Sequence, residues 1–291
     1  MCKGSFLHLA DCNPLLLASS TAFFATFSIA PIFVIIIRMF SVILGEQAIK
    51  AEILLNMKTW LGKQAATAVH DALENMSMMA GEWYYTLLGF AFMIFIASSL
   101  WGTIKVAINH IWGVKTKTGL NYRMMIKDRF IGIFLIMIFG SLILINIFSH
   151  LMLVYIRRNT ESFTGDYNMI LAELAGEFVS FVMMILWFVL IYRILPAAKV
   201  EWKVVWTGGM VTGVLFAIGR LSLIKLLPSE GLSNIYGASG SYMLILLFVF
   251  YSALIFYLGA AFTRKYAEFA GYEIRPKSNA IRVRTDDVFD E

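Results

Sequence analysis

The stretch "SYMLILLFVFYSALIFYLGAAF", residues 241–262, contains no Asp, Glu, Lys or Arg. A helix needs about 20 mostly apolar residues to cross the hydrocarbon core of a bilayer. The segment must be helical, because lipid offers no partners for the backbone N–H and C=O groups of a single span. The stretch therefore predicts a transmembrane helix and a membrane-embedded fold.

The composition of the whole chain supports this fold class. Of its 291 residues 59% are hydrophobic and 15% are charged, whereas soluble domains carry about 25% charged residues. The other stretches long and apolar enough to span are residues 15–44, 83–108, 130–156, 171–195 and 204–227. We predict an all-α, polytopic membrane protein with six transmembrane helices in a single domain, residues 1–270. A partly disordered cytoplasmic tail, residues 271–291, is expected to follow.

The distribution of Lys and Arg predicts the orientation of the spans. The connection 109–129 holds five Lys or Arg and one acidic residue, and the connection 193–203 and the tail are also basic. The connection 45–82 instead holds three Lys against five Asp or Glu. Because basic connections stay on the cytoplasmic side, both termini are predicted to be cytoplasmic.

The first outer connection, residues 46–80, is predicted to be more than a linker. Its apolar residues, such as Ile49, Ile53 and Met57, recur near helical spacing with charged residues between them. This pattern predicts one or two amphipathic helices on the outer surface of the membrane. Whether the segment is only a cap or binds a partner is left open.

Four ionisable residues fall into one layer of the predicted outer half. At a rise of 1.5 Å per residue, each lies about 9–11 Å from the outer end of its span. An Asn lies one turn deeper, and a second Glu lies one turn above the first. In chain order these residues are Arg38, Asn146, His150, Glu173, Glu177 and Arg220. Charged residues inside spans usually face a cavity or a partner, so we call this set the polar layer.

Two interpretations of the polar layer remain open. Arg38 and Arg220 carry forked donors that match phosphate or carboxylate groups, which favours an outward-facing cavity for an anion. Alternatively, the arginines reach up to the outer interface, and Glu177 pairs with Arg220 only to hold helices together.

Small and polar residues gather in "SNIYGASGS", residues 233–241, just before the last span. The segment is either a tight turn, permitted by its glycines, or a cover over an anion site in the polar layer. The second interpretation uses the backbone amides at the start of the last helix, since helix N-termini attract anions. The residues concerned are Asn234, Tyr236, Gly237, Gly240 and Ser241.

Small residues in the last two spans predict close helix packing. Gly209 and Gly213 form a GxxxG pair, and Ser252 and Gly259 lie two helical turns apart on one face. Such stripes let helix backbones approach each other in lipid.

Motifs for catalysis and metal binding are absent from the sequence. It contains no GxxxxGK[ST], HExxH, CxxC or GxSxG, and its four His are scattered over different segments. We therefore predict no catalytic residue, no metal, no cofactor and no nucleic-acid partner, and we do not expect an enzyme.

A series of short motifs runs from the outer turn to the end of the last span. They are Tyr236-Gly237, Gly240-Ser241, Tyr251-Ser252, Leu258-Gly259-Ala260 and Thr263-Arg264. Together with "SIAP", residues 28–31, and "SSLWGTIKVAINHIWGV", residues 98–114, they resemble the YihY/BrkB family of bacterial inner-membrane proteins.

The resemblance implies a six-helix protein of the bacterial cytoplasmic (inner) membrane, in a family without an agreed activity. The family was once labelled ribonuclease BN, and the absence of nuclease motifs argues against that label. Many members carry Glu where this chain has Ala261, so an acid there cannot be essential to its mechanism.

Three functions are carried forward from the sequence. The first is a transport-type protein that handles an amphiphilic anion or lipid through an outward-facing polar cavity. The second is a cation/proton exchanger that uses Glu177 and His150. The third is a non-catalytic membrane scaffold or envelope assembly factor. Membrane lipids are the expected partners, with an anionic lipid or a small ion as substrate, and the oligomeric state is left open.

Overall fold

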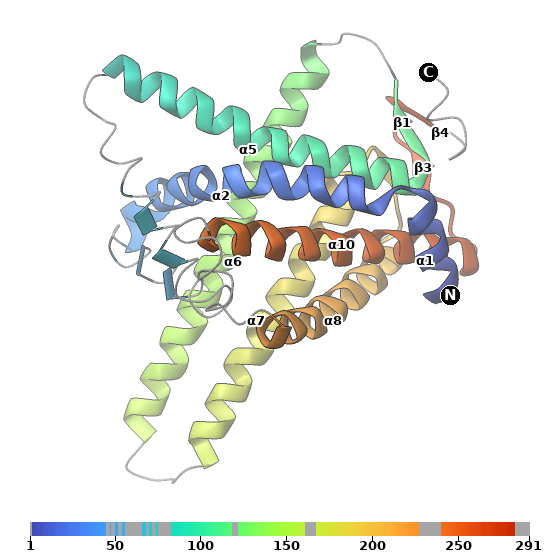
Figure 1. The fold of residues 1–291 in the computed structure, drawn as a ribbon. Coiled ribbons are helices and arrows are strands. Elements are labelled where there is room, and N and C mark those ends of the chain that lie inside the picture. The colour runs from blue at the N-terminus through green and yellow to red at the C-terminus, as the bar shows by residue number, and fades with distance from the viewer. Residues whose placement is uncertain are drawn as a thin grey trace.

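The computed structural model describes residues 2–44, 83–117, 122–160, 167–226 and 240–282, and isolated residues between 45 and 82 (Figure 1). The helices are α1 (Cys2–Asp11), α2 (Pro14–Leu44), α5 (Trp83–Trp112), α6 (Tyr122–Thr160), α7 (Tyr167–Ile194), α8 (Trp202–Leu226) and α10 (Gly240–Phe269). The strands are β1 (Val114–Thr116), β2 (Ala198–Lys199), β3 (Arg275–Pro276) and β4 (Ala280–Arg282).

Within the described part, four helices are long and apolar enough to cross a membrane. The qualifying stretches are Arg129–Asn146 in α6, Leu174–Ile194 in α7, Trp202–Leu221 in α8 and Met243–Phe269 in α10. A fifth span results if Gly4–Asp11 and Pro14–Ile29, which meet at 71°, count as one broken span. The prediction of a helical membrane protein is thus confirmed, while six spans and cytoplasmic termini stay predictions.

The last helix, α10, lies at the centre of the fold. It packs against α8, α2 and α5, and α1 covers its end. Figure 1 shows α2, α5 and α10 side by side, with the α6–α7 hairpin crossing them. Small residues of α10 are buried in these contacts, among them Ala253, Ala260 and Ala261. Their short side chains let the neighbouring helices approach closely.

Glycines bring α8 against both α7 and α10. A Cβ atom added to Gly209 or Gly213 would overlap side chains of α7. One added to Gly259 would overlap the hydroxyl of Thr212 on α8. Ser252, two turns before Gly259, is half-buried on α10.

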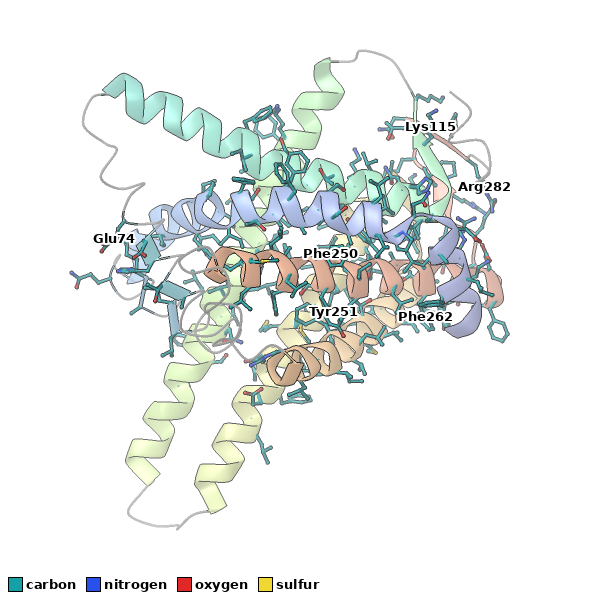
Figure 2. The ribbon with its side chains drawn as sticks, viewed as in Figure 1. Glu74, Lys115, Phe250, Tyr251, Phe262 and Arg282 are labelled. Carbon is teal, nitrogen blue, oxygen red and sulfur yellow. The ribbon has the colours of Figure 1, made fainter. Side chains whose placement is uncertain are left out.

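The strands gather at one end of the molecule, next to α1 and the end of α10 (Figure 1). We call this end the terminal cap and define it as α1 with residues 109–117, 194–202 and 264–282. Lys115 and Arg282 mark it in Figure 2. The positive-inside prediction assigns the terminal cap to the cytoplasmic side.

The tail fastens two connections of the terminal cap together. β4 pairs antiparallel with β1 after α5, and β3 pairs antiparallel with β2 after α7. Between the two strands, Lys277 donates from its backbone N to Ala197 O at 2.9 Å and from Nζ to Pro196 O at 2.6 Å. Part of the tail is therefore paired and ordered, which the sequence did not predict, and residues 283–291 lie outside the described residues.

The predicted amphipathic helices of the first outer connection lie mostly outside the described residues. Those that are described there are helical, and His70 Nε2 lies 3.5 Å from Glu74 Oε1, one turn away. Amphipathic helices at residues 46–80 stay a prediction.

Candidate functional site

The structure describes half of the polar layer at the level of side chains. The described members are Asn146 on α6, Glu177 on α7 and Arg220 on α8. The side chains of Arg38, His150 and Glu173 lie outside the described residues, so the layer as a whole stays a prediction.

Asn146 connects α6 to α7 through a hydrogen bond. Its Nδ2 donates to Ser180 Oγ at 2.9 Å, and Ser180 Oγ donates to Gly176 O at 3.0 Å. Glu177 lies one turn before Ser180 but is exposed on α7. No ion pair joins Glu177 to Arg220, both of which are described, so the interpretation of this pair as a helix-to-helix link loses its support.

Arg220 lies where α8 meets α10. Its neighbour Gly219 is so close to α10 that an added Cβ would overlap Ile255 and press on Tyr251. The Arg220 side chain is half-buried, and its Nε is shielded from solvent. It lies six residues, about 9 Å along the helix axis, before α8 ends at Leu226. In the apolar stretch Trp202–Leu221 it is the next-to-last residue. A charged residue within such a stretch marks a candidate functional position.

The outer turn predicted to cover the polar layer lies largely outside the described residues. This holds for Asn234, Tyr236 and Gly237. Gly240 and Ser241 are the first residues of α10. Whether the turn faces Arg220 therefore stays a prediction.

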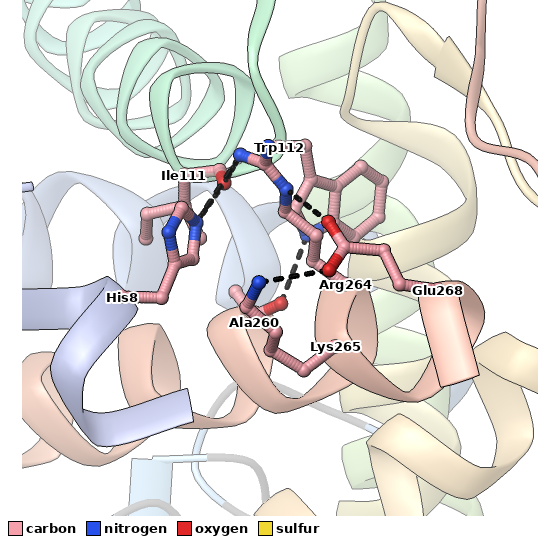
Figure 3. Close-up of polar contacts among 7 residues, drawn as sticks. All are labelled: His8, Ile111, Trp112, Ala260, Arg264, Lys265 and Glu268. Carbon is pink, nitrogen blue, oxygen red and sulfur yellow. Dashed lines mark hydrogen bonds and ion pairs between the residues drawn. The ribbon is translucent and has the colours of Figure 1, made fainter. Parts of the chain in front are cut away.

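A second polar cluster lies in the terminal cap, where α5 ends (Figure 3). Gly113 stops α5 because its φ of 66° is open to glycine but costly for other residues. The carbonyl of Ile111, in the last turn of α5, accepts hydrogen bonds from His8 Nε2 at 2.8 Å and from Arg264 Nη1 at 2.7 Å. A cation at a helix C-terminus also interacts favourably with the negative end of the helix dipole.

His8 and Arg264 converge on this carbonyl without bonding to each other. Their nitrogens are 3.2 Å apart, but an arginine cannot accept, and the His8 Nε2 proton is directed at Ile111 O. Burial lowers the pKa of His8 below its usual value, and the Arg264 charge lowers it further, while the bond to Ile111 opposes both. His8 is therefore neutral at pH 7.

Arg264 also holds the end of α10. Its Nε donates to Glu268 Oε1 at 3.1 Å, and Lys265 Nζ donates to Glu268 Oε2 at 2.8 Å. Trp112 Nε1, at the end of α5, donates to Ala260 O of α10 at 3.0 Å. The ends of α1, α5 and α10 are thus fixed relative to one another (Figure 3).

The end of α10 redirects the chain into the tail. Tyr272 N donates to Ala267 O at 2.9 Å and Gly271 N donates to Glu268 O at 3.4 Å, with Gly271 at a φ of 74°. This pair of bonds is a Schellman motif, which requires a left-handed residue at the position of Gly271. The turn borders a cavity of about 260 Å³ beside Arg264.

Buried hydroxyls join four helices deeper in the bundle. Tyr257 on α10 and Thr21 on α2 share a hydrogen bond of 2.5 Å. Tyr192 on α7 donates to Phe256 O at 2.7 Å and lies 3.0 Å from Thr212 Oγ1 of α8. Gly259 packs directly on Thr212, so this set fills the interior and has a structural role. Among the described residues, no three His, Cys, Asp or Glu gather to hold a metal ion.

Comparisons with known proteins agree on one family. A family model described as virulence factor BrkB matches residues 7–282. The chain is 25% identical over 210 residues to a UPF0761 membrane protein of Vibrio cholerae, covering 71% of this chain and 65% of that protein. It is 27% identical over 253 residues to a UPF0761 membrane protein of Mannheimia succiniciproducens, covering 84% and 82%. No solved structure matches this chain.

The family match extends from α1 to β4 and includes the terminal cap. Motif residues noted in the sequence have defined places in the structure. Thr263 packs against Gly208, where an added Cβ would overlap its hydroxyl, and Arg264 closes the end of α5. The chain spans 65% of the length of the Vibrio cholerae relative. From residue 7 to residue 282, therefore, the chain belongs to the BrkB family of membrane proteins.

Proposed function

We propose that this chain is a transport-type protein of the bacterial inner membrane that handles an amphiphilic anion, such as an anionic lipid. Arg220 binds the anionic group in an outward-facing polar cavity. The observation that carries the proposal is the position of Arg220, a half-buried guanidinium beside the close contact of α8 with α10.

The chemistry of arginine supports an anion as ligand. A charged residue in the membrane costs free energy and is usually kept for a ligand or a partner. The planar fork of guanidinium donors matches the oxygens of phosphate and carboxylate groups. The ligand is amphiphilic because the neighbouring side chains Ile218 and Leu221 are apolar and exposed.

The start of α10 supplies a second attraction for an anion. α10 begins at Gly240, and only 13 residues, 227–239, separate it from the end of α8. The first backbone N–H groups of a helix have no partners within the helix and carry a partial positive charge. We propose that these amides and Arg220 act on the same anionic group.

The alternative of a cation/proton exchanger depends on Glu177 and His150. An exchanger needs its carboxylate in an enclosed path, but Glu177 is exposed on α7 beside Leu174 and Phe178. The anion proposal is therefore preferred over the exchanger. We propose no enzymatic step, and a scaffold without ligand is the remaining alternative.

The test is retention of lipid by the purified full chain. Native mass spectrometry of wild type and Arg220→Ala, each equilibrated with phosphatidylglycerol, measures the bound fraction. We expect about tenfold weaker retention in the variant, since a hydrogen bond to a charged group contributes about 1.5 kcal/mol. Arg275→Ala is the matched control, because Arg275 is exposed in the tail.

The same preparations separate the alternatives. Equal lipid retention in wild type and Arg220→Ala would contradict the anion proposal. Proton flux in proteoliposomes that disappears in Glu177→Gln would favour the exchanger. Wild-type function in cells carrying both substitutions would favour the scaffold.

A further inference from the structure

The cavity in the terminal cap lies at the other end of the molecule from Arg220. It is a half-open pocket bordered by the end of α5, the end of α10 and the tail. Its volume of about 260 Å³ is below the range of about 300–1,000 Å³ that holds drug-sized ligands, so it suits a smaller group. The lining residues are Trp112, Arg264, Glu268, Gly271, Tyr272, Glu273, Ile274 and Arg282.

The charged lining consists of two cations and two anions. Arg264 pairs with Glu268 at 3.1 Å, and Arg282 Nη1 lies 3.6 Å from Glu273 Oε1. The net charge of the lining is therefore zero, although the terminal cap as a whole is basic. A ligand that carries only one sign of charge would face two lining residues of the same sign, and these would repel it.

Arg264 is the lining residue that the surrounding structure holds most firmly in place. Its side chain is only 18% exposed, because Ile111 O and Glu268 hold its Nη1 and Nε. Within the part of the chain that the structure describes, Arg264 Nη2 has no hydrogen-bond partner. A guanidinium carries five donors, so this nitrogen offers two N–H groups to a ligand in the cavity.

The lining also contains two aromatic residues, Trp112 and Tyr272. Trp112 is buried, and its only donor, Nε1, is already bonded to Ala260 O. Tyr272 is half-buried in the turn that ends α10. Ammonium groups bind over such rings and beside carboxylates such as that of Glu273.

From this pairing of charges and rings we propose that the cavity binds a small zwitterion. One end of the ligand is a phosphate or carboxylate held by Arg264 and Arg282. The other end is an ammonium group held by Glu273 and the rings of Trp112 and Tyr272. The headgroup of a zwitterionic phospholipid and a free solute such as a glycerophosphoamine share this chemistry. The site goes beyond the transport proposal and does not depend on it.

The test uses the full chain in detergent and soluble probes that differ in charge. Titration calorimetry compares glycerophosphoethanolamine, which carries both charges, with glycerol 3-phosphate and with ethanolamine. We expect the zwitterion to bind most tightly. Arg282→Gln should weaken it about tenfold, the loss of one hydrogen bond to a charged group. Glu273→Gln should remove the preference for the zwitterion over glycerol 3-phosphate.

Arg275→Gln is the matched control for these variants. Arg275 pairs with the same Glu273 at 3.1 Å, but it is not part of the cavity lining. All three side chains are more than half exposed, and ion pairs on the surface contribute little to stability, so the variants should fold. Unchanged melting temperatures would verify this.

Native mass spectrometry in nanodiscs distinguishes the two sources of the ligand. Enrichment of phosphatidylethanolamine over phosphatidylglycerol, lost in Arg282→Gln, would identify a lipid headgroup. Binding of the soluble zwitterion without lipid enrichment would identify a solute. Equal binding of glycerol 3-phosphate and the zwitterion, no binding of either, or wild-type affinity in Arg282→Gln would overturn the proposal.

Discussion

Two half-buried arginines, Arg264 and Arg220, differ in what surrounds them. Arg264 lies in the terminal cap, where it donates to the last-turn carbonyl of Ile111 and to Glu268. Arg220 lies about two turns before the end of α8, beside the contact with α10 and next to the exposed, apolar Leu221. Burial alone does not distinguish the two side chains.

The bonds of Arg264 give it a role in the fold, whereas Arg220 is the residue that we propose for the ligand. A cation at the C-terminus of a helix completes hydrogen bonds that the helix leaves open, so it stabilises the fold. A cation along an apolar helix costs free energy unless something compensates it. We therefore expect stability to depend on Arg264 and ligand binding to depend on Arg220.

The largest expected effect is that of Arg264→Ala on stability. The substitution removes the donors to Ile111 O and to Glu268 Oε1. Each hydrogen bond to a charged group contributes about 1.5–3 kcal/mol, so we expect a loss of about 3 kcal/mol in free energy of unfolding. The apparent melting temperature in detergent, followed by size-exclusion chromatography after heating, should fall sharply.

Arg220→Ala is the counterpart, measured on delipidated protein. It should lower the melting temperature less than Arg264→Ala does, since removing a charge from an apolar span offsets the loss of the contacts that Arg220 makes. Equal losses in Arg220→Ala and Arg264→Ala would erase the distinction between the two arginines. A fall for Arg220→Ala alone would reverse it.

A smaller effect is expected from Gly259→Ala, at the contact of α10 with α8. The added Cβ would overlap Thr212 and crowd the hydroxyl of Tyr192, which is bonded to Phe256 O. Overpacking of this kind costs about 1–3 kcal/mol. Gly102→Ala on α5 is the control, because nothing lies within 4 Å of the added atom.

In Gly102→Ala the exposed helix should gain stability by about 0.5–1 kcal/mol, from the better helix propensity of Ala. The two alanines should thus shift the melting temperature in opposite directions. Equal shifts would mean that the α8–α10 contact adjusts freely. In that case, the arrangement of helices around Arg220 would not be rigid either.

The spans could be predicted from the sequence because apolar length is a strong local signal. The stretches Leu174–Ile194 and Met243–Phe269 overlap the predicted spans closely. The strands of the terminal cap could not be predicted, since two or three residues are too short to show alternation. The ten-residue helix α1 is likewise too short for the span criterion.

The residues of the candidate site also differ in whether a local sequence signal reveals them. Arg220 could be found from the sequence, because a charge in an apolar run stands out. The role of Arg264 could not be found, although its motif was noticed, because its partner Ile111 is 153 residues away. The same holds for His8, whose only sequence signal is a histidine near the N-terminus. Contacts between distant segments leave no trace in local spacing.

The smallest expected effect concerns His8 and pH. Burial lowers the pKa of His8, so the unfolded chain binds a proton more readily than the folded one. Stability should therefore be complete above the unfolded pKa of about 6.5 and should decrease as the pH falls from there toward the lower folded pKa.

His8→Gln keeps a donor for Ile111 O but cannot titrate, and His110 is present in both proteins. Between pH 7.5 and 5.0 the melting temperature should fall more steeply for wild type than for His8→Gln. The difference should be smaller than the losses expected for Arg264→Ala and Gly259→Ala. Parallel profiles would mean that protonated His8 is tolerated beside Arg264, and that the terminal cap accepts a second cation at the end of α5.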